Sequence, residues 1–365
     1  SDLNYSKKSS IFASKSELTK MNNKRVTIYD LAKAINLSPS YISKALNNHP
    51  SVGDKMKEKV RKAAKDLNYK HNSYAANLRM GISKTIGVIV PHINKSFFSE
   101  LIAGIEEVCF EHDYGLIICQ SQESYEKECR AIDTLIRQNV DGILISVSAE
   151  TNSSEHLQNI INHDTILIQI DRFIENFNSY KVTNDNEKLA YNATMHLINQ
   201  GYQNIVFLGW TEQLTIDQLR KRGYLQAMKT SGLTSHIYDN AIQKDKTKEI
   251  ITLLLSSNTP PDAFLTFSDE QALCVLQVAN SLGIKVPQEL GIIGSGNDIL
   301  TEITTPTLSA VNQKSIEIGR KAANLYFEIL AGKNDNPVEI KEEIIQAEII
   351  GRESTAKNKI GRAHV

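Results

Sequence analysis

Short apolar runs alternate with helix-compatible segments along the chain from Thr85 onward, and this alternation limits the possible folds more than any other feature. Most of these runs are rich in Val, Ile and Leu. Short strands of this kind between helices are typical of a parallel sheet covered by helices on both faces. Seven runs are too many for one small sheet and predict two doubly wound α/β lobes. The runs are 85–91, 116–120, 141–147, 165–171, 204–209, 262–267 and 290–294.

The sequence before these runs has a different pattern, with three short helices predicted over residues 27–70. The first helix begins at Thr27, a residue type that caps helix N-termini. Ser38 caps the second helix, and Pro39 takes its first position, where the missing N–H costs nothing. The third helix is predicted over 54–68. We therefore expect a small all-α head in front of the α/β body.

Charge is distributed unevenly between these two parts. Residues 21–82 contain twelve Lys and Arg against four Asp and Glu, a net charge of +8, whereas residues 83–365 carry −11. A basic head on an acidic body indicates that the head contacts a polyanion and the body does not. The alternative is a basic surface that is merely solvated.

Two helices joined by a tight turn, the second exposing small polar and cationic side chains, form a helix-turn-helix pattern. The major groove of DNA admits one α-helix, and residues near its N-terminus reach the base edges. Lys44 is the first candidate for a guanine or phosphate contact, and the basic third helix would pair with phosphates. The predicted DNA-binding residues of the head are Thr27, Ser38, Pro39, Ser40, Tyr41, Ser43, Lys44, Asn47 and Tyr69.

Residues 71–82 follow the head and have two interpretations. One is a flexible linker. The other is a short helix, capped by Asn72, that forms only when something holds it, because isolated helices of about two turns are marginal in water. In the second case Asn72, Ala75 and Leu78 would contact DNA, with Leu78 wedged into a minor-groove step.

The chain resembles the Lac repressor/galactose repressor family of bacterial transcription regulators over nearly all of residues 24–354. The matching stretches are "VTIYDLAKAINLS", "YISKALN" and "KVRKAAKDLNYKHNSYAANLR" in the head, and "IGVIVPHINKSFF", "DGILI", "IDR", "HLINQGYQNIVFLG", "RKRGYLQAM", "GIKVPQELGIIG" and "TPTLSAVNQ" in the body. The resemblance implies an operator-binding head, a hinge helix and a periplasmic-binding-protein-like effector domain.

The resemblance also implies domain boundaries. We expect a disordered extension over 1–23, the helix-turn-helix domain over 24–70 and the hinge over 71–82. The effector-domain N-lobe would comprise 83–184 and 312–340, the C-lobe 185–311 and 341–354, and a disordered tail 355–365.

Candidate ligand-binding residues lie where strands end, because ligands of two-lobed α/β domains bind at the carboxyl ends of the strands. Arg220, in "RKRG", matches the effector-binding arginine of the family, and a guanidinium can hold paired acceptors. Phe97 and Phe98 are either stacking rings or core residues, and Arg172 could lock Asp171 in an ion pair. Helix capping is an equal alternative for Asp269. The predicted effector-binding residues are Phe97, Phe98, Asp171, Arg220, Asp269, Gly296, Asn297 and Gln313.

The sequence departs from the family pattern at several points. Tyr41 and Lys44 replace the usual Thr and Arg of the recognition helix, and "AANL" stands in the hinge where Ala-Arg is common. Gly296 occupies the position of an Asp that binds the effector in the family. The operator and the effector therefore cannot be transferred from relatives.

Other classes of protein are less consistent with the sequence. No apolar run approaches the ~18 residues of a membrane span, and the first twenty residues lack the apolar core of an export signal. The four cysteines form no CxxC pair, so we expect reduced thiols and neither a metal site nor a cofactor. An exported solute-binding protein would lack the head, and an enzyme on a Rossmann-like scaffold would need a Gly-rich loop or catalytic cluster.

We therefore predict a cytoplasmic, sequence-specific DNA-binding transcription regulator, a repressor and not an enzyme. It would bind double-stranded operator DNA as a homodimer, without contact to a membrane. A small-molecule effector, expected to be a sugar or sugar derivative, would bind between the lobes and change operator affinity.

Overall fold

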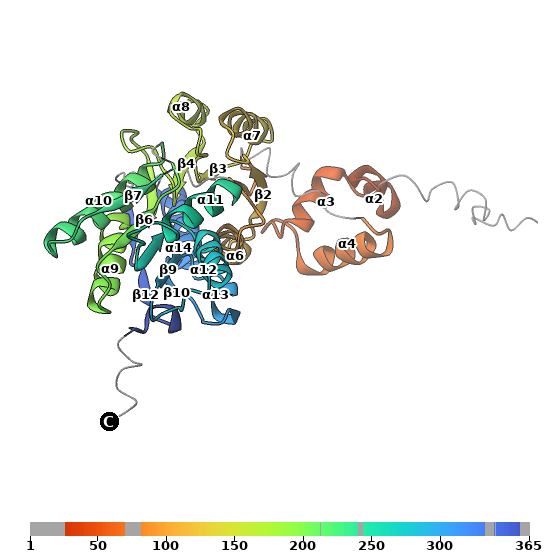
Figure 1. The fold of residues 1–365 in the computed structure, drawn as a ribbon. Helices are drawn as coiled ribbons and strands as arrows, with labels where there is room; N and C mark the ends of the chain where they lie inside the picture. Colours follow the sequence, from red (N-terminus) through yellow and green to blue (C-terminus); the bar gives the residue numbers. More distant parts are fainter. Residues whose placement is uncertain are drawn as a thin grey trace, which may run out of the picture. The chain divides into compact units, whose positions relative to one another are not determined.

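A computed structural model describes residues 26–69, 82–211, 213–239, 244–332, 339 and 341–357. The chain divides into a head and a body, with the division after Gly81. Figure 1 shows the helices of the head and the α/β layers of the body. The predicted extension over 1–23 lies outside the described residues, as does the predicted hinge apart from Ile82, including Asn72, Ala75 and Leu78.

The head consists of the three predicted helices, α2 (Ile28–Ile35), α3 (Pro39–Leu46) and α4 (Asp54–Asp66). Their apolar faces meet in one small core, in which Leu31, Ile42 and Val60 are fully buried. The third helix ends at Asp66, two residues before the predicted end at residue 68, and Leu67, its C-cap residue, is exposed. The fold class predicted for the head is confirmed.

The first lobe of the body is a parallel six-stranded sheet covered by helices on both faces. Successive strand residues face opposite sides, so Val88 packs against α6 and α14, and its neighbour Ile89 packs against α7 and α8. The strands, in spatial order, are β11 (Glu342–Ile345), β5 (Tyr180–Asn184), β4 (Ile166–Ile170), β3 (Gly142–Ile145), β1 (Thr85–Val90) and β2 (Gly115–Gln120). The helices are α6 (Ser96–Glu111), α7 (Tyr125–Arg137), α8 (Glu155–Asn162) and α14 (Ser315–Gly332).

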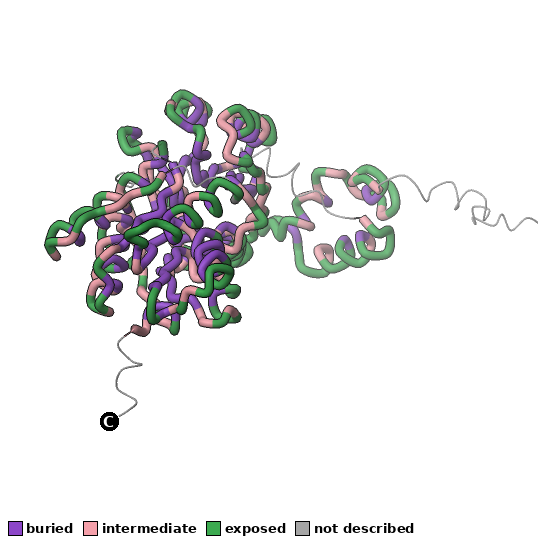
Figure 2. Tube along the Cα trace, viewed as in Figure 1, coloured by how far each residue is buried: buried purple, intermediate pink, exposed green. Residues whose placement is uncertain are grey.

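The second lobe repeats this arrangement with a second six-stranded sheet, which confirms the prediction of two doubly wound lobes. Its strands are parallel except for the β10–β12 pair. The strands, in spatial order, are β12 (Glu348–Ile350), β10 (Ser309–Asn312), β9 (Gly291–Ser295), β8 (Ala263–Thr266), β6 (Ile205–Leu208) and β7 (His236–Tyr238). The helices are α9 (Asn186–Asn199), α10 (Thr215–Thr230), α11 (Lys244–Leu255), α12 (Asp269–Leu282) and α13 (Leu300–Ile303), and η2 (Glu353–Thr355) is a 3₁₀ turn. Figure 2 shows the sheets as buried layers beneath helices with exposed outer faces.

The chain crosses between the two lobes three times, after β5, between β10 and α14, and between β11 and β12. The third crossing lies later than predicted. Residues 341–345 were assigned to the C-lobe, but β11 pairs in parallel with β5, with Glu342 opposite Lys181, and so belongs to the first sheet. The side chain of Asn184 joins all three crossings, because its Nδ2 donates to the carbonyl oxygens of Gln313 (3.1 Å) and Ile345 (2.8 Å).

The end of the described chain is packed against the second lobe. Thr355 is buried and its hydroxyl lies 2.7 Å from that of Ser309 and 2.8 Å from His196 Nε2. These hydrogen bonds hold Thr355 in place, so it does not belong to a disordered tail as predicted, and residues 358–365 of that predicted tail lie outside the described residues.

Candidate functional site

The turn between α2 and α3 is fixed by local hydrogen bonds. Thr27 and Asp30 form a capping box at the start of α2, with Thr27 N donating to Asp30 Oδ2 at 2.8 Å. Asn36 ends that helix in the left-handed region, at a φ of 56°. Ser38 Oγ then accepts from Tyr41 N at 3.2 Å and caps α3. Both helices therefore begin at a capped N-terminus, and the first turn of α3 is partly open to solvent.

The predicted DNA-binding side chains divide into two groups. Thr27, Ser38, Ser40, Lys44 and Asn47 are exposed, and Lys44 has no ion-pair partner among the described residues. The others are partly buried: Pro39, Ser43, Tyr41 and Tyr69. Tyr41 and Tyr69 pack against the core of the head, so their rings stabilise it as well as facing solvent.

Helix α4 adds a cationic surface to the head. Its exposed face carries Lys55, Lys59, Arg61, Lys62 and Lys65. Among the described residues of the head, one ion pair occurs, between Lys57 and Asp54. Most of these cations are thus available to a polyanion such as the DNA backbone.

The body contains a cavity of about 960 Å³ between its two lobes. It is lined by residues that follow the strands of both sheets and by the first turns of α6 and α12. Seven of the eight predicted effector-binding residues line it: Phe97, Phe98, Asp171, Arg220, Asp269, Gly296 and Gln313. The carboxyl ends of parallel strands meet at one edge of each sheet, and the two edges face each other here.

Asn297 is not among the lining residues. Its Oδ1 accepts a hydrogen bond from Arg352 Nη2 at 2.7 Å, which ties the side chain to the end of the second lobe. The prediction of an effector contact at Asn297 is therefore not supported, because its neighbours Gly296 and Asp298 face the cavity while its own side chain is bonded elsewhere.

Arg220 lies at the base of the cavity and is only 2% exposed. Its guanidinium donates to Asn186 Oδ1 (2.8 Å), the Phe267 carbonyl oxygen (3.0 Å) and Gln313 Oε1 (2.8 Å). It also lies over the Phe267 ring at 4.6 Å. Three residues further along α10, Gly223 allows a close approach to α9, because a Cβ there would come within 1.9 Å of Glu187 O. Burial lowers the pKa of Arg220 to about 10, against the attraction of Asp171.

Arg172 is held by a different carboxylate from the one considered in the sequence. Its Nη1 donates to both carboxylate oxygens of Glu123, at 3.0 and 2.8 Å. Its Nε lies 3.9 Å from Asp171 Oδ2. The guanidinium lies near the rings of Phe98 (5.5 Å), from the first lobe, and Trp210 (4.7 Å), from the second. Burial raises the pKa of the Asp171 carboxyl, and the two arginines oppose the shift.

Position 296 has no carboxylate because it is a glycine, but the carboxylate of Asp269 lies close to it. A Cβ at Gly296 would lie 2.8 Å from Asp269 Oδ2, so the Asp269 carboxylate fills the space beside the glycine. That oxygen accepts from Asp298 N at 2.7 Å. Burial raises the pKa of Asp269 to about 6, partly offset by this hydrogen bond.

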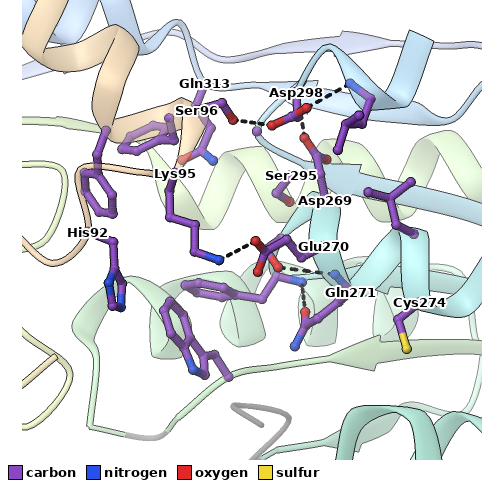
Figure 3. Close-up of a pocket in the computed structure, with 18 of the residues that line it drawn as sticks. His92, Lys95, Ser96, Asp269, Glu270, Gln271, Cys274, Ser295, Asp298 and Gln313 are labelled. Atoms are coloured by element: carbon purple, nitrogen blue, oxygen red, sulfur yellow. Dashed lines mark hydrogen bonds and ion pairs between the residues drawn. The ribbon is translucent and has the colours of Figure 1, made fainter. Parts of the chain in front are cut away.

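Two contacts connect the lobes at the mouth of the cavity. Lys95 pairs with Glu270, and Ser96 Oγ donates to Asp298 Oδ2. Figure 3 shows both pairs, with Lys95 and Ser96 at the start of α6 opposite Glu270 and Asp298. These four residues and Trp210 were not predicted from the sequence. Their positions at the starts of α6 and α12 or shortly after β6 and β9 were the available signal, but no residue type there stood out.

Comparisons with known proteins agree for both parts of the chain. Residues 27–72 match the family described as bacterial regulatory proteins, lacI family, and residues 194–355 match the periplasmic binding protein-like domain. Catabolite control protein A of Priestia megaterium is 32% identical over 305 residues, which cover 82% of this chain and 91% of that protein.

Solved structures with the same fold include two of particular use. A periplasmic binding protein/LacI transcriptional regulator from Alkaliphilus metalliredigens, complexed with D-xylulofuranose, is 26% identical with a TM-score of 0.65, covering 74% of this chain and 99% of its own. The Lac repressor dimer bound to operator and the anti-inducer ONPF has a TM-score of 0.80 at 18% identity, covering 91% of this chain and 99% of that chain. Over the parts of the chain placed in the structure, no helix is long and apolar enough to cross a membrane.

Proposed function

Because the chain belongs to the LacI family of bacterial regulatory proteins, we infer that it is a DNA-binding transcription regulator that binds operator DNA as a dimer and responds to a small molecule. The observation that carries the DNA-binding role is the capped helix-turn-helix with exposed Lys44 and the cationic face of α4. A gel-shift series with DNA fragments that flank the gene tests the DNA-binding role. A shift that depends on neither the DNA sequence nor the salt concentration would contradict it.

We propose further that the regulator is a repressor acting in the cytoplasm, where its operator is found, and that it binds its ligand without transforming it. Two heads of a dimer would read two half-sites of a near-palindrome. The ligand would change operator affinity only to the extent that it binds one arrangement of the lobes better than another.

The ligand proposed for the cleft is a sugar or sugar derivative. Aromatic rings from Phe97, Phe98 and Trp210 line the cavity together with the buried Asp171 and Arg220. Aromatic walls with a few fixed polar groups are the usual composition of a small-molecule pocket. The sugar complex of the relative from Alkaliphilus metalliredigens supports the same class.

A panel of neutral sugars and nucleobases, read as thermal shifts of the full chain, tests the proposed ligand class. A saturable shift with a sugar, lost in Arg220→Ala, is expected. Shifts with nucleobases alone would overturn the sugar assignment and leave the regulatory role in place.

A further inference from the structure

We propose that the cleft excludes anionic ligands, such as phosphorylated sugars, and takes an uncharged hydroxylated molecule, because Glu270 and Asp298 of one lobe occupy the two cationic positions at the start of α6 in the other. This inference rests on the cleft being the ligand site proposed above. It assigns to Glu270 and Asp298 the role of specificity-determining residues.

The first cationic position is the ammonium group of Lys95. Lys95 is the N-cap residue of α6 and lines the cavity. Glu270, in the first turn of α12, pairs with it across the mouth. A phosphate that entered the cavity would have to displace this carboxylate or lie beside it.

The second cationic position is the N-terminus of α6. The first N–H groups of a helix have no partner within the helix and carry a partial positive charge, which makes them a common binding position for anions. Helix α6 has no side-chain cap of its own and no acidic residue in its first turn. Asp298 supplies the negative charge there from the other lobe, since its Oδ2 accepts from Ser96 Oγ while its Oδ1 accepts from Leu300 N at 2.8 Å.

The remaining cations of the cavity are also committed. Arg172 donates to both oxygens of Glu123. Arg220 uses three of its N–H groups on protein acceptors and lies within the electrostatic influence of Asp171. In total the lining contains five carboxylates and three Lys and Arg side chains: Glu123, Asp171, Asp269, Glu270 and Asp298 against Lys95, Arg172 and Arg220.

This excess of carboxylates opposes any ligand that brings a further negative charge, because like charges brought together in a partly dehydrated cleft repel strongly. A neutral polyhydroxy ligand meets no such penalty. Its hydroxyl groups can donate to the Asp171 carboxylate, which is 4% exposed, and its apolar face can pack on the aromatic rings.

The test uses the full-length protein and the intrinsic fluorescence of Trp210, which is the only tryptophan of the chain and lines the cavity. Wild type and the double variant Glu270→Gln/Asp298→Asn are titrated with inorganic phosphate and with ribose 5-phosphate, and in parallel with ribose and with KCl at equal ionic strength. The matched control is Asp133→Asn/Glu111→Gln, which removes two exposed carboxylates outside the cavity.

We expect no saturable response of wild type or control to either phosphate compound, and a saturable response of the double variant with an affinity at least about tenfold higher. Wild type that binds either phosphate compound as tightly as the double variant overturns the proposal, as does a folded double variant that binds neither. Glu270→Gln alone, a change at an exposed side chain, gives a partial gain if the double variant does not fold. An absence of neutral-sugar binding would contradict the proposed ligand class, whereas the phosphate titrations test the charge exclusion separately.

Discussion

The carboxylate of Asp269 lies beside the backbone of Gly296, where a side-chain carbon would meet Asp269 Oδ2 at 2.8 Å. Gly296 also has a φ of 142°, in the region that favours glycine. The backbone conformation thus requires glycine at this position, and a side-chain carbon would also push the Asp269 carboxylate away from its hydrogen bond with Asp298 N. Asp269 supplies the carboxylate in this part of the cleft.

Replacement of Gly296 should therefore destabilise the body. We expect Gly296→Ala and Gly296→Asp each to lower the free energy of unfolding by ~1–3 kcal/mol, because a side chain adds backbone strain and repulsion against Asp269. Chemical denaturation measures this. Gly115→Ala is the control, since a Cβ there meets nothing nearer than 3.9 Å. A Gly296→Asp variant as stable as wild type would contradict the steric argument.

Asp269 should make stability depend on pH. Burial raises its pKa from 3.8 to about 6, so the folded protein keeps this proton to a higher pH than the unfolded chain does. Stability contributed by the protonated form is present below pH ~4 and is lost as pH rises toward 6. Relative to Asp269→Asn, which cannot ionise, wild type should lose ~1–3 kcal/mol between pH 4 and 7. Denaturation curves at each pH measure the difference, and a constant offset would show that the pKa is not raised.

Lys44→Ala should weaken operator binding without changing the response to ligand. The Lys44 side chain is exposed on α3, so its removal leaves the core of the head intact. A lost base or phosphate contact costs about 1–3 kcal/mol, or roughly tenfold in affinity or more. Fluorescence anisotropy with operator DNA measures the loss. Lys229→Ala, exposed on α10, is the control, and equal losses in the two variants would mean that only net charge matters.

Arg220→Lys should reduce ligand affinity by at least about tenfold, although it retains the positive charge, because an ammonium group cannot reproduce the planar set of donors that binds Asn186, Phe267 and Gln313 and so shapes the base of the cavity. The measurement is the thermal shift given by the best neutral sugar of the panel. Arg222→Ala, a partly exposed residue two positions further along α10, should behave as wild type. Unchanged affinity in Arg220→Lys would place the ligand away from the base of the cavity.

Most strands that the sequence predicted are buried, and their apolar runs reflect helices on both faces, although β2 was predicted as well and is partly exposed. Strands β5, β7, β10, β11 and β12 were not predicted. The sequences of β5 and β11, YKVTN and EEII, carry charged or polar residues, and β10, SAVN, is buried but only four residues long with polar residues at both ends. The assignment of β11 to the wrong lobe follows from the same cause. Its place is fixed by pairing with a strand far away in sequence, which local patterns do not record.

The candidate site was predicted where a distinctive side chain follows a strand, as with Asp171, or where the family motif names the residue, as with Arg220 inside α10. Trp210 follows β6 in the same way but was passed over. Glu270 and Asp298 become candidate site residues only because they contact Lys95 and Ser96 on the other lobe. Contacts of this kind depend on how the lobes face each other, and no spacing within one segment predicts them.

The side-chain amide of Asn184 connects the three segments of the chain that cross between the lobes, because Asn184 lies in one segment and donates hydrogen bonds to the other two. Because the three connections are bonded together at one place, we expect the lobes to swing about an axis near this residue more readily than they slide or shear past each other. A single angle between the lobes would then describe opening and closing of the cleft. Substitution of Asn184 would allow other lobe movements, which do not couple ligand binding to the affinity for DNA.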